Sequence, residues 1–207
     1  MKKPIVSPFF YLLFGIVALF SCENTPRKLP ILGERDFVNG DSVYHSIPDF
    51  KFINQDGAEV SNKTFEGKIY VSDFFFTTCP TICPVMKKQM LRVYEKFKEN
   101  SQVGILSHSI DPRHDSVQVL REYVTRLGVK GNMWQFVTGE KDKIYEIGEK
   151  SYYVTAGEDS TAAGGIIHSG AFILVDKKRR VRGLYDGTKE EDVTKLMKDM
   201  DVLLNEK

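Results

Sequence analysis

Two cysteines, Cys79 and Cys83, are the residues best suited to carry chemistry, because of their spacing and their place in the chain. They lie in the segment 77–84, between an apolar, β-prone run and a stretch with helical periodicity. Thiols at a helix N-terminus meet unpaired backbone N–H groups, which lower the thiol pKa and favour thiolate. Residues four apart share a helix face, so both sulfurs can converge on one ion, and soft thiolates suit Cu(I) or zinc. The pair is therefore a local disulfide, a metal clamp or a redox couple.

His168 is the histidine best placed to join the two cysteines. It lies in the segment 165–170, just before an apolar strand expected at 171–175. Thioredoxin-type oxidoreductases place two residues between their cysteines and generally carry a cis-proline before the facing strand, whereas here three residues intervene and the segment has no proline. Imidazole suits copper in either common oxidation state, so His168 is a candidate third ligand, the alternative being a satisfied core histidine. The remaining histidines are expected on the surface or in loops: His45, His108 and His114.

The N-terminus has the pattern of a bacterial export leader. Lys2 and Lys3 precede an uncharged apolar run at 9–20, which is shorter than the roughly 20 residues needed to span a bilayer. The segment 19–22, Leu-Phe-Ser-Cys, resembles a lipobox, in which Cys22 becomes the acylated first residue, and two or more acyl chains give stable anchoring. The alternative is an uncleaved membrane anchor with an incidental cysteine. Either interpretation predicts an exported, membrane-anchored protein that faces the periplasm or the cell exterior.

The composition predicts one globular domain and no nucleic-acid partner. The 207 residues include 29 Lys and Arg against 28 Asp and Glu, so no net field favours nucleic acid or an anionic membrane. Residues 1–21 are expected to be a signal peptide, 22–46 a polar tether and irregular lead-in, and 47–207 the domain. The basic run at 177–180 flanks an apolar strand and is interpreted as a solvated turn.

Strand and helix alternate along the domain, which predicts an α/β fold with a central mixed sheet. An N-terminal hairpin-like extension at about 50–60 precedes 69–76, an apolar run typical of a central strand. The segment 152–165 reads as a loop. A helix is expected over 83–98, and its apolar stripe comprises Val85, Met86, Met90, Val93, Tyr94 and Phe97. The other expected elements are strand 103–110, helix 116–127, strand 133–138, helix 141–150, a hairpin of 171–175 and 181–185, and helix 190–204.

Three segments together resemble the Sco/SenC family, whose members are copper-binding assembly factors for cytochrome c oxidase. They are FFFTTCP through the second CP at 74–84, SIDPRHD at 109–115 and HSGAFILVD at 168–176. The resemblance covers roughly 48–204 and implies a thioredoxin-like fold. It places the family's copper ligands on Cys79, Cys83 and His168.

The resemblance also places the family's acidic pair, implicated in partner or copper handling, on Asp111 and Asp115. The alternative for this pair is that both cap the helix that begins near Ser116, since Asp before a helix satisfies backbone donors. One position departs from many members, because Thr81 stands where an aspartate often lies between the cysteines. This loss of a negative charge beside the metal bears on Cu(II) affinity and redox poise, and leaves the ligand set as it is.

Three functions are compatible with these residues. In the first, the protein binds one copper ion, Cu(I) or Cu(II), and delivers it to the copper-centre subunit of a respiratory cytochrome c oxidase. In the second, it is a thiol-disulfide oxidoreductase that uses Cys79 and Cys83, and a disulfide between them would block copper binding. The third is a structural zinc site or a copper sensor. We expect the first, because an open site of three ligands on a tether suits exchange, with an upstream copper donor or thiol reductant as a further partner.

Overall fold

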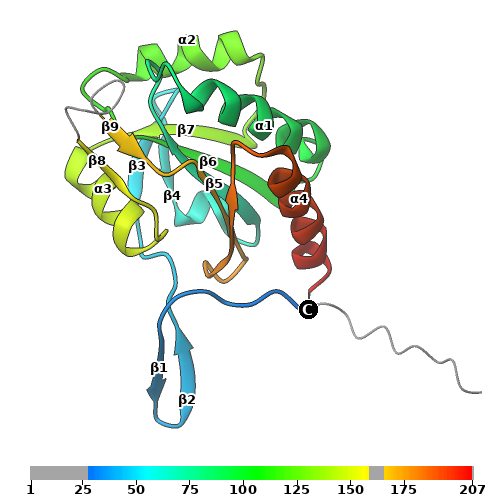
Figure 1. Cartoon of the computed structure of the whole chain (residues 1–207). Coiled ribbons are helices and arrows are strands. Elements are labelled where there is room, and N and C mark those ends of the chain that lie inside the picture. The colour runs from blue at the N-terminus through cyan, green and yellow to red at the C-terminus, as the bar shows by residue number, and fades with distance from the viewer. Residues whose placement is uncertain (1–27, 159–165, 207) are drawn as a thin grey trace, which may run out of the picture.

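The computed structural model describes residues 28–158 and 166–206, apart from the side chains of residues 156–168. A seven-stranded mixed sheet forms its centre, in the order β11-β10-β5-β6-β7-β3-β4 (Figure 1). The parallel centre consists of β5 (Ile69–Phe75), β6 (Val103–Ser109) and β7 (Trp134–Thr138). Antiparallel strands complete both edges: β10 (Ala171–Val175) and β11 (Val181–Asp186) on one, β3 (Lys51–Asn54) and β4 (Glu59–Ser61) on the other. The predicted α/β architecture and both predicted hairpins are confirmed.

Four α-helices pack around this sheet: α1 (Ile82–Phe97), α2 (Val117–Leu127), α3 (Lys141–Lys150) and α4 (Glu190–Asn205). The two faces can be told apart at β5, where successive side chains point to opposite sides. Phe75 lies under Lys87 of α1, whose Nζ is 4.0 Å from the centre of the ring. Phe74 faces α3, where a Cβ added to Gly148 would lie 3.1 Å from the ring. Helices α1 and α3 therefore cover opposite faces of the sheet, and glycine at 148 allows α3 its close approach.

The buried face of α1 differs in part from the predicted apolar stripe. Met86, Met90, Val93, Tyr94 and Phe97 are buried as expected, whereas Val85 is 43% exposed. Lys87 is buried in its place, only 1% exposed. The stripe prediction is therefore wrong at Val85, because a polar contact beneath the helix selects a lysine for the core.

The lead-in contains a two-stranded hairpin where the sequence analysis expected irregular chain. It consists of β1 (Arg35–Val38) and β2 (Asp41–Tyr44), and projects from the body of the domain in Figure 1. The turn residues Asn39 and Gly40 have φ angles of 52° and 88°. Two left-handed residues in sequence form the turn that matches the twist of a tight hairpin, and Asn-Gly is its most favoured pair.

A second antiparallel pair consists of β8 (Ala156–Glu158), inside the segment 152–165 that was expected as a loop, and β9 (Ile166–His168), directly after that segment. The prediction of a loop over 152–165 is therefore wrong at β8, and residues 159–165 of this segment lie outside the described residues. The leader at 1–21 and the candidate acylated residue Cys22 lie outside the described residues. Within the ranges that the structure describes, no helix has the length and apolar character needed to cross a bilayer.

Candidate metal centre

The two cysteines lie close together but on different elements: Cys79 in the loop after β5 and Cys83 in the first turn of α1. Strand β5 ends at Phe75, and a short loop then carries Cys79 to the start of α1. Helix α1 begins at Ile82 with Thr81 as its N-cap, so only Cys83 is helical. The prediction that both cysteines share one helix face is wrong for Cys79, which stands before the first turn. Both are nevertheless buried, Cys79 at 8% and Cys83 at 2% exposed, and no disulfide joins them.

The sulfur of Cys79 receives the hydrogen-bond donors at the start of α1. Burial raises the pKa of this thiol, but hydrogen bonds from the backbone N–H groups of Cys83 and Thr81 outweigh burial and leave the pKa below its ordinary value. The Thr81 hydroxyl lies 3.7 Å from the Cys79 sulfur, and the Thr81 side chain caps no helix N–H group. Cys79 is thus the residue that the helix terminus prepares as a thiolate.

Cys83 has the opposite character. Burial raises its pKa to about 12, and its thiol donates a hydrogen bond to the sulfur of Cys79, which keeps the proton on Cys83. The backbone N–H of Phe76 and the charge of Lys87 act in the other direction. In the metal-free site Cys79 is thus the more acidic of two hydrogen-bonded sulfurs and Cys83 the protonated one, and a soft metal cation that binds both must displace the proton of Cys83.

A buried ion pair lies one helical turn beyond Cys83. Nζ of Lys87 is 2.6 Å from Oδ2 of Asp73 on β5 and 3.1 Å from Oγ of Ser107 on β6. Ser107 also donates to Asp73 and accepts from the indole N–H of Trp134 at 2.9 Å. The side chains of Lys87 and Asp73 are 2% and 0% exposed. The site is thus supported from beneath by a fully connected polar network inside an aromatic core.

Asp115, which is buried in the loop before α2, is hydrogen-bonded to the start of the cysteine loop. Its carboxylate accepts hydrogen bonds from the backbone N–H of Thr77 at 3.1 Å and from the hydroxyl of Ser109 at 2.6 Å. The capping alternative is wrong for this residue, because Ser116 caps α2 by accepting from the N–H of Val119. Asp115 therefore ties the segment before Cys79 to the end of β6.

Asp111 is half-buried in the same loop, and its backbone is hydrogen-bonded within the turn that leads to Asp115. Its carbonyl accepts from the N–H groups of Asp115 and His114 at 2.9 and 3.1 Å. These bonds form the turn that presents Asp115 to the cysteine loop. The two acidic residues thus differ: the carboxylate of Asp115 is buried and organises the loop, whereas Asp111 is half-buried.

His168 is the last residue of β9, where its backbone pairs with Ala156, and its side chain lies outside those that the structure describes. The chain that follows it runs beside the start of the cysteine helix. Ser169, Gly170 and Ala171 line a hollow of about 480 Å³ together with Ile82, the residue before Cys83. A Cβ on Gly170 would lie 3.6 Å from the Ile82 side chain. Among the described side chains no three metal ligands converge, so Cys79 and Cys83 are the pair that the structure brings together.

Comparison with known proteins assigns the chain to a family. A sequence profile described as SCO1/SenC matches residues 40–204. The chain belongs to the SCO1/SenC family. A SCO1/SenC family lipoprotein from Bacillus anthracis is 28% identical, with a TM-score of 0.71 over 77% of this chain and 95% of that chain.

Two further solved structures are similar to this SCO1/SenC chain. BsSco, described as a cytochrome c oxidase assembly protein with a disulfide switch, is 30% identical, with a TM-score of 0.69 over 79% of this chain and 95% of that chain. ScoI of Arabidopsis thaliana, solved with copper bound, is 27% identical, with a TM-score of 0.63 over 77% of this chain and 98% of that chain. The predicted thioredoxin-like fold is confirmed.

One histidine of this SCO1/SenC chain lies where the sequence does not predict it. His108 was expected on the surface or in a loop, but it lies on β6 and is fully buried. Its ring stacks on Phe74 with the centres 4.6 Å apart, and Nδ1 is 3.2 Å from the hydroxyl of Ser72. Burial lowers its pKa to about 4, so the ring is neutral at physiological pH. The signal that could have located it is its place in the middle of a strand covered on both faces.

Proposed function

We propose that this protein is a copper carrier that binds one copper ion through Cys79, Cys83 and His168. The observation that carries the proposal is the pair of adjacent buried sulfurs at the start of α1, one of them held toward the thiolate form. Two thiolates are soft ligands that suit Cu(I), and an added imidazole suits Cu(II) as well. The copper-bound relative from Arabidopsis thaliana supports the choice of copper.

Each ligand has a distinct part in this proposal. Cys79 supplies the more acidic thiol, whose pKa the start of α1 lowers, and Cys83 releases its proton when the metal binds. His168 supplies the third donor from the chain that leads into β10, and the packing of Gly170 beside Ile82 supports its approach. At Thr81, a hydroxyl stands beside the metal, so the site carries one negative charge fewer than it would with aspartate.

Delivery to the copper-centre subunit of a respiratory cytochrome c oxidase is the second part of the proposal. The description of BsSco as an oxidase assembly protein supports this destination. We further propose that Cys22 is acylated and holds the domain outside the cytoplasm on a membrane, with 22–46 as the tether. The lipoprotein description of the relative from Bacillus anthracis supports the anchor.

Copper binding is tested by titrating the reduced protein with Cu(I) and Cu(II). The expected result is one copper per chain, with sulfur-to-Cu(II) charge-transfer absorption that is lost in Cys79→Ser and strongly altered in His168→Ala. His114→Ala is the matched control, because His114 is exposed and outside the site, and its spectrum should equal that of the parent. A His168→Ala variant with the parent spectrum and affinity would remove His168 from the ligand set.

Delivery and export are tested in cells. Deletion of the gene should lower assembled oxidase activity, and added copper should restore part of it. A Cys22→Ala variant should lose the acyl chains, measured by mass spectrometry of the membrane fraction. Full oxidase activity in the deletion strain at low copper would contradict the proposed delivery.

A dithiol reductase is the second candidate, favoured by the difference between the two thiols. The Cys79 thiolate would attack a disulfide in a partner and release one partner thiolate. Cys83, losing its proton, would then attack Cys79 and release the second, leaving a Cys79–Cys83 disulfide and a reduced partner dithiol. Catalytic turnover by the metal-free protein that is unchanged in His168→Ala would favour this activity, whereas stoichiometric reaction alone would exclude it.

A further inference from the structure

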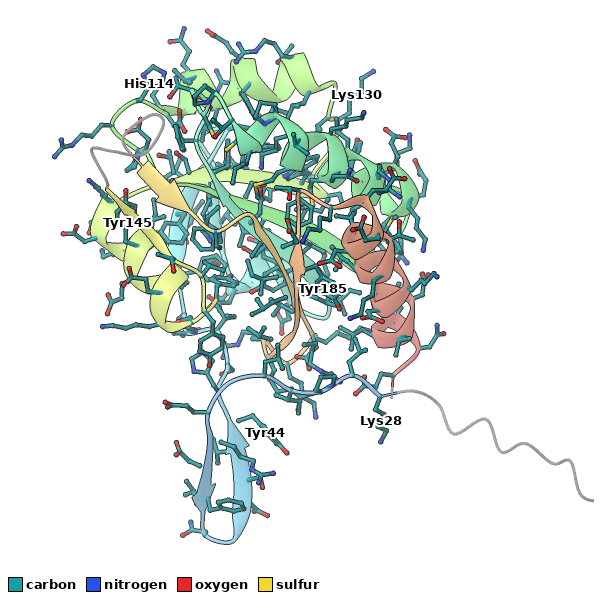
Figure 2. The ribbon with its side chains drawn as sticks, viewed as in Figure 1. Lys28, Tyr44, His114, Lys130, Tyr145 and Tyr185 are labelled. Carbon is teal, nitrogen blue, oxygen red and sulfur yellow. The ribbon has the colours of Figure 1, made fainter. Side chains whose placement is uncertain are left out.

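The cysteine site and the N-terminal entry lie at opposite ends of the domain. Strand β5 begins at Ile69 beside the turn between β10 and β11, and ends at the cysteine loop. Seven residues at about 3.3 Å each separate these two ends by about 20 Å. Figure 2 shows the same arrangement, with His114 of the loop before α2 at one end of the domain and Lys28 at the other.

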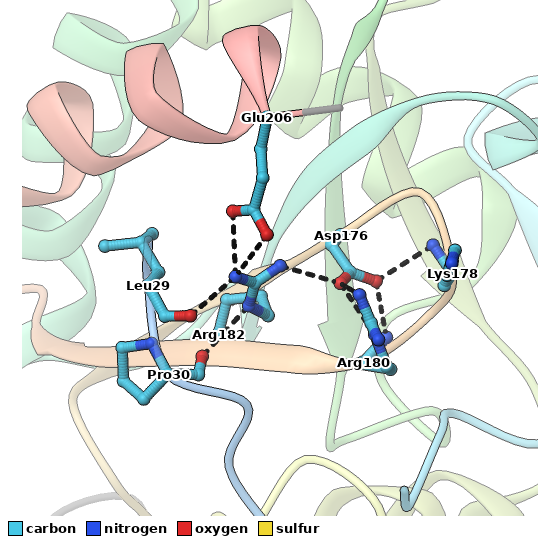
Figure 3. A network of polar contacts seen from close by, with 7 residues as sticks. All are labelled: Leu29, Pro30, Asp176, Lys178, Arg180, Arg182 and Glu206. Carbon is cyan, nitrogen blue, oxygen red and sulfur yellow. Dashed lines mark hydrogen bonds and ion pairs between the residues drawn. The ribbon is translucent and has the colours of Figure 1, made fainter. Parts of the chain in front are cut away.

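The entering chain is fixed to that second end by Arg182 (Figure 3). Its guanidinium donates to the carbonyls of Leu29 at 2.6 Å and Pro30 at 2.9 Å. It also binds the carboxylates of Asp176 at 3.0 Å and Glu206 at 2.8 Å. With its side chain 3% exposed, Arg182 joins the entry to both the β10–β11 turn and the end of α4.

Four cations surround a hollow at this end, and we call them the basic face: Lys63, Lys177, Lys178 and Arg179. They line about 480 Å³ of space together with Asn62, Phe65 and one acid, Glu66. Arg179 is paired with Asp49 at 2.6 Å. For the three lysines, no carboxylate among the described residues lies within ion-pair distance. The near-zero net charge of the chain thus conceals a local excess of positive charge.

Three of the four cations of the basic face, Lys177, Lys178 and Arg179, lie on the turn between β10 and β11, and hydrogen bonds hold this turn in one conformation. Oδ1 of Asp176 accepts from the backbone N–H groups of Lys178 at 2.8 Å and Arg180 at 3.0 Å. Arg179 takes the left-handed conformation, with a φ of 64°, and its N–H donates to the Asp176 carbonyl. Asp176 is itself only 6% exposed. The turn therefore presents Lys177 and Lys178 to solvent on a fixed backbone.

The proposed acylation site lies a short distance from this end. Lys28 lies six residues after Cys22, and six steps at 3.3–3.6 Å per residue span about 20 Å at most. An anchor at Cys22 would hold Lys28, at the same end of the domain as the basic face, within this reach of the lipid headgroups. An anionic surface attracts nearby Lys and Arg and loses this attraction over a Debye length of about 8 Å at physiological salt.

We infer that the basic face docks on the anionic phospholipid headgroups of the membrane that carries the chain. This inference rests on the proposed acylation of Cys22. The hollow accepts phosphate groups between Lys63 and the β10–β11 turn, while the cysteine loop points away from the lipid at the far end of β5. The docked orientation presents the metal site to a partner that extends from the membrane.

The test is lysine footprinting of the full acylated chain on vesicles. Acetylation of Lys63, Lys177 and Lys178 should slow by about five-fold when phosphatidylglycerol is added to phosphatidylcholine vesicles. Lys88 and Lys130 are exposed and outside the basic face, so their rates in the same molecules should stay constant. The protection should disappear in about 1 M salt, where the Debye length is near 3 Å.

Two further samples complete the test: charge variants of the lysines, and phosphatidylcholine vesicles with added inorganic phosphate. In Lys177→Gln/Lys178→Gln, Lys63 should regain its unprotected rate on phosphatidylglycerol, whereas Lys88→Gln/Lys130→Gln should leave its protection intact. Equal rates on both vesicles, or protection on phosphatidylcholine by inorganic phosphate alone, would overturn membrane docking. Failure of the chain to sediment with either vesicle would overturn the anchor and the docking together. Copper uptake by the same samples reports separately on the proposed function, which survives if docking alone fails.

Discussion

Removing Lys87 should destabilise the protein far more than removing an exposed lysine. The ammonium is the partner of a fully buried carboxylate, and its loss leaves Asp73 with the Ser107 hydroxyl as its remaining described donor. Breaking a buried pair in this way costs about 3–5 kcal/mol, because a charge stays in the core without compensation. Methionine is the replacement of choice, since it keeps the length of the side chain over the Phe75 ring.

The loss of stability in Lys87→Met can be measured as a fall in the melting temperature, Tm. For a domain of 150–250 residues, 1 kcal/mol shifts Tm by about 2–4 °C, so Lys87→Met should lower Tm by about 10 °C. In the double variant Asp73→Asn/Lys87→Met, most of this loss should return, because no charge is left buried. A double-mutant cycle from urea unfolding would then give a coupling energy of about 2 kcal/mol or more.

Helix α1 itself supplies the control. Lys96 pairs with Asp201 at 2.7 Å, but the two side chains are 40% and 50% exposed. Such a pair contributes about 0.2–1 kcal/mol, so Lys96→Met should change Tm by only a few degrees. Equal losses in Lys87→Met and Lys96→Met, or additive single losses in the Asp73–Lys87 cycle, would refute the reasoning.

Three further predictions concern protonation and the cysteine loop. Because the pKa of His108 is about 4 when folded and about 6.5 when unfolded, the unfolded state binds the extra proton. The free energy of unfolding should fall by about 3 kcal/mol as the pH drops from 6.5 to 4, and urea titrations should show this in the parent and in His114→Gln but not in His108→Gln. Iodoacetamide at neutral pH should alkylate Cys79 before Cys83 in the reduced, metal-free protein; peptide mapping that finds Cys83 modified first would contradict the pKa difference. Asp115→Asn should weaken copper affinity several-fold without abolishing it, and an unchanged affinity would show that the loop holds its shape without this carboxylate.

The sequence identified most of the fold because its elements are locally consistent. The helix ends predicted for α3 coincide with those observed, Lys141 and Lys150. Strand β5 was predicted within one residue, because a strand covered on both faces is nearly continuously apolar, here interrupted only by Ser72 and Asp73. The hairpin β1–β2 differs from the expected irregular chain although Asn39-Gly40 is a strong local hairpin signal, because the polar composition of the lead-in favours irregular chain over strands.

The site was predicted where it depends on neighbours in sequence and missed where it depends on distant ones. Cys79 and Cys83 follow from their spacing at the start of a helix. The role of Lys87 does not, because its partner Asp73 lies on a different element and a lysine in an apolar stripe reads as a solvated residue. The same limit applies to Asp115, whose partner Thr77 lies 38 residues away in the chain.

Any pull on a tethered domain enters through the residues that fasten its first segment. With the proposed anchor at Cys22, a pull would pass from the carbonyls of Leu29 and Pro30 to the guanidinium of Arg182 and on to the carboxylates of Asp176 and Glu206. These contacts would share the load between the β10–β11 turn and the end of α4. The loop that carries the sulfurs lies beyond the far end of β5, so the proposed anchoring would keep a pull on the first segment away from the geometry of the cysteine pair.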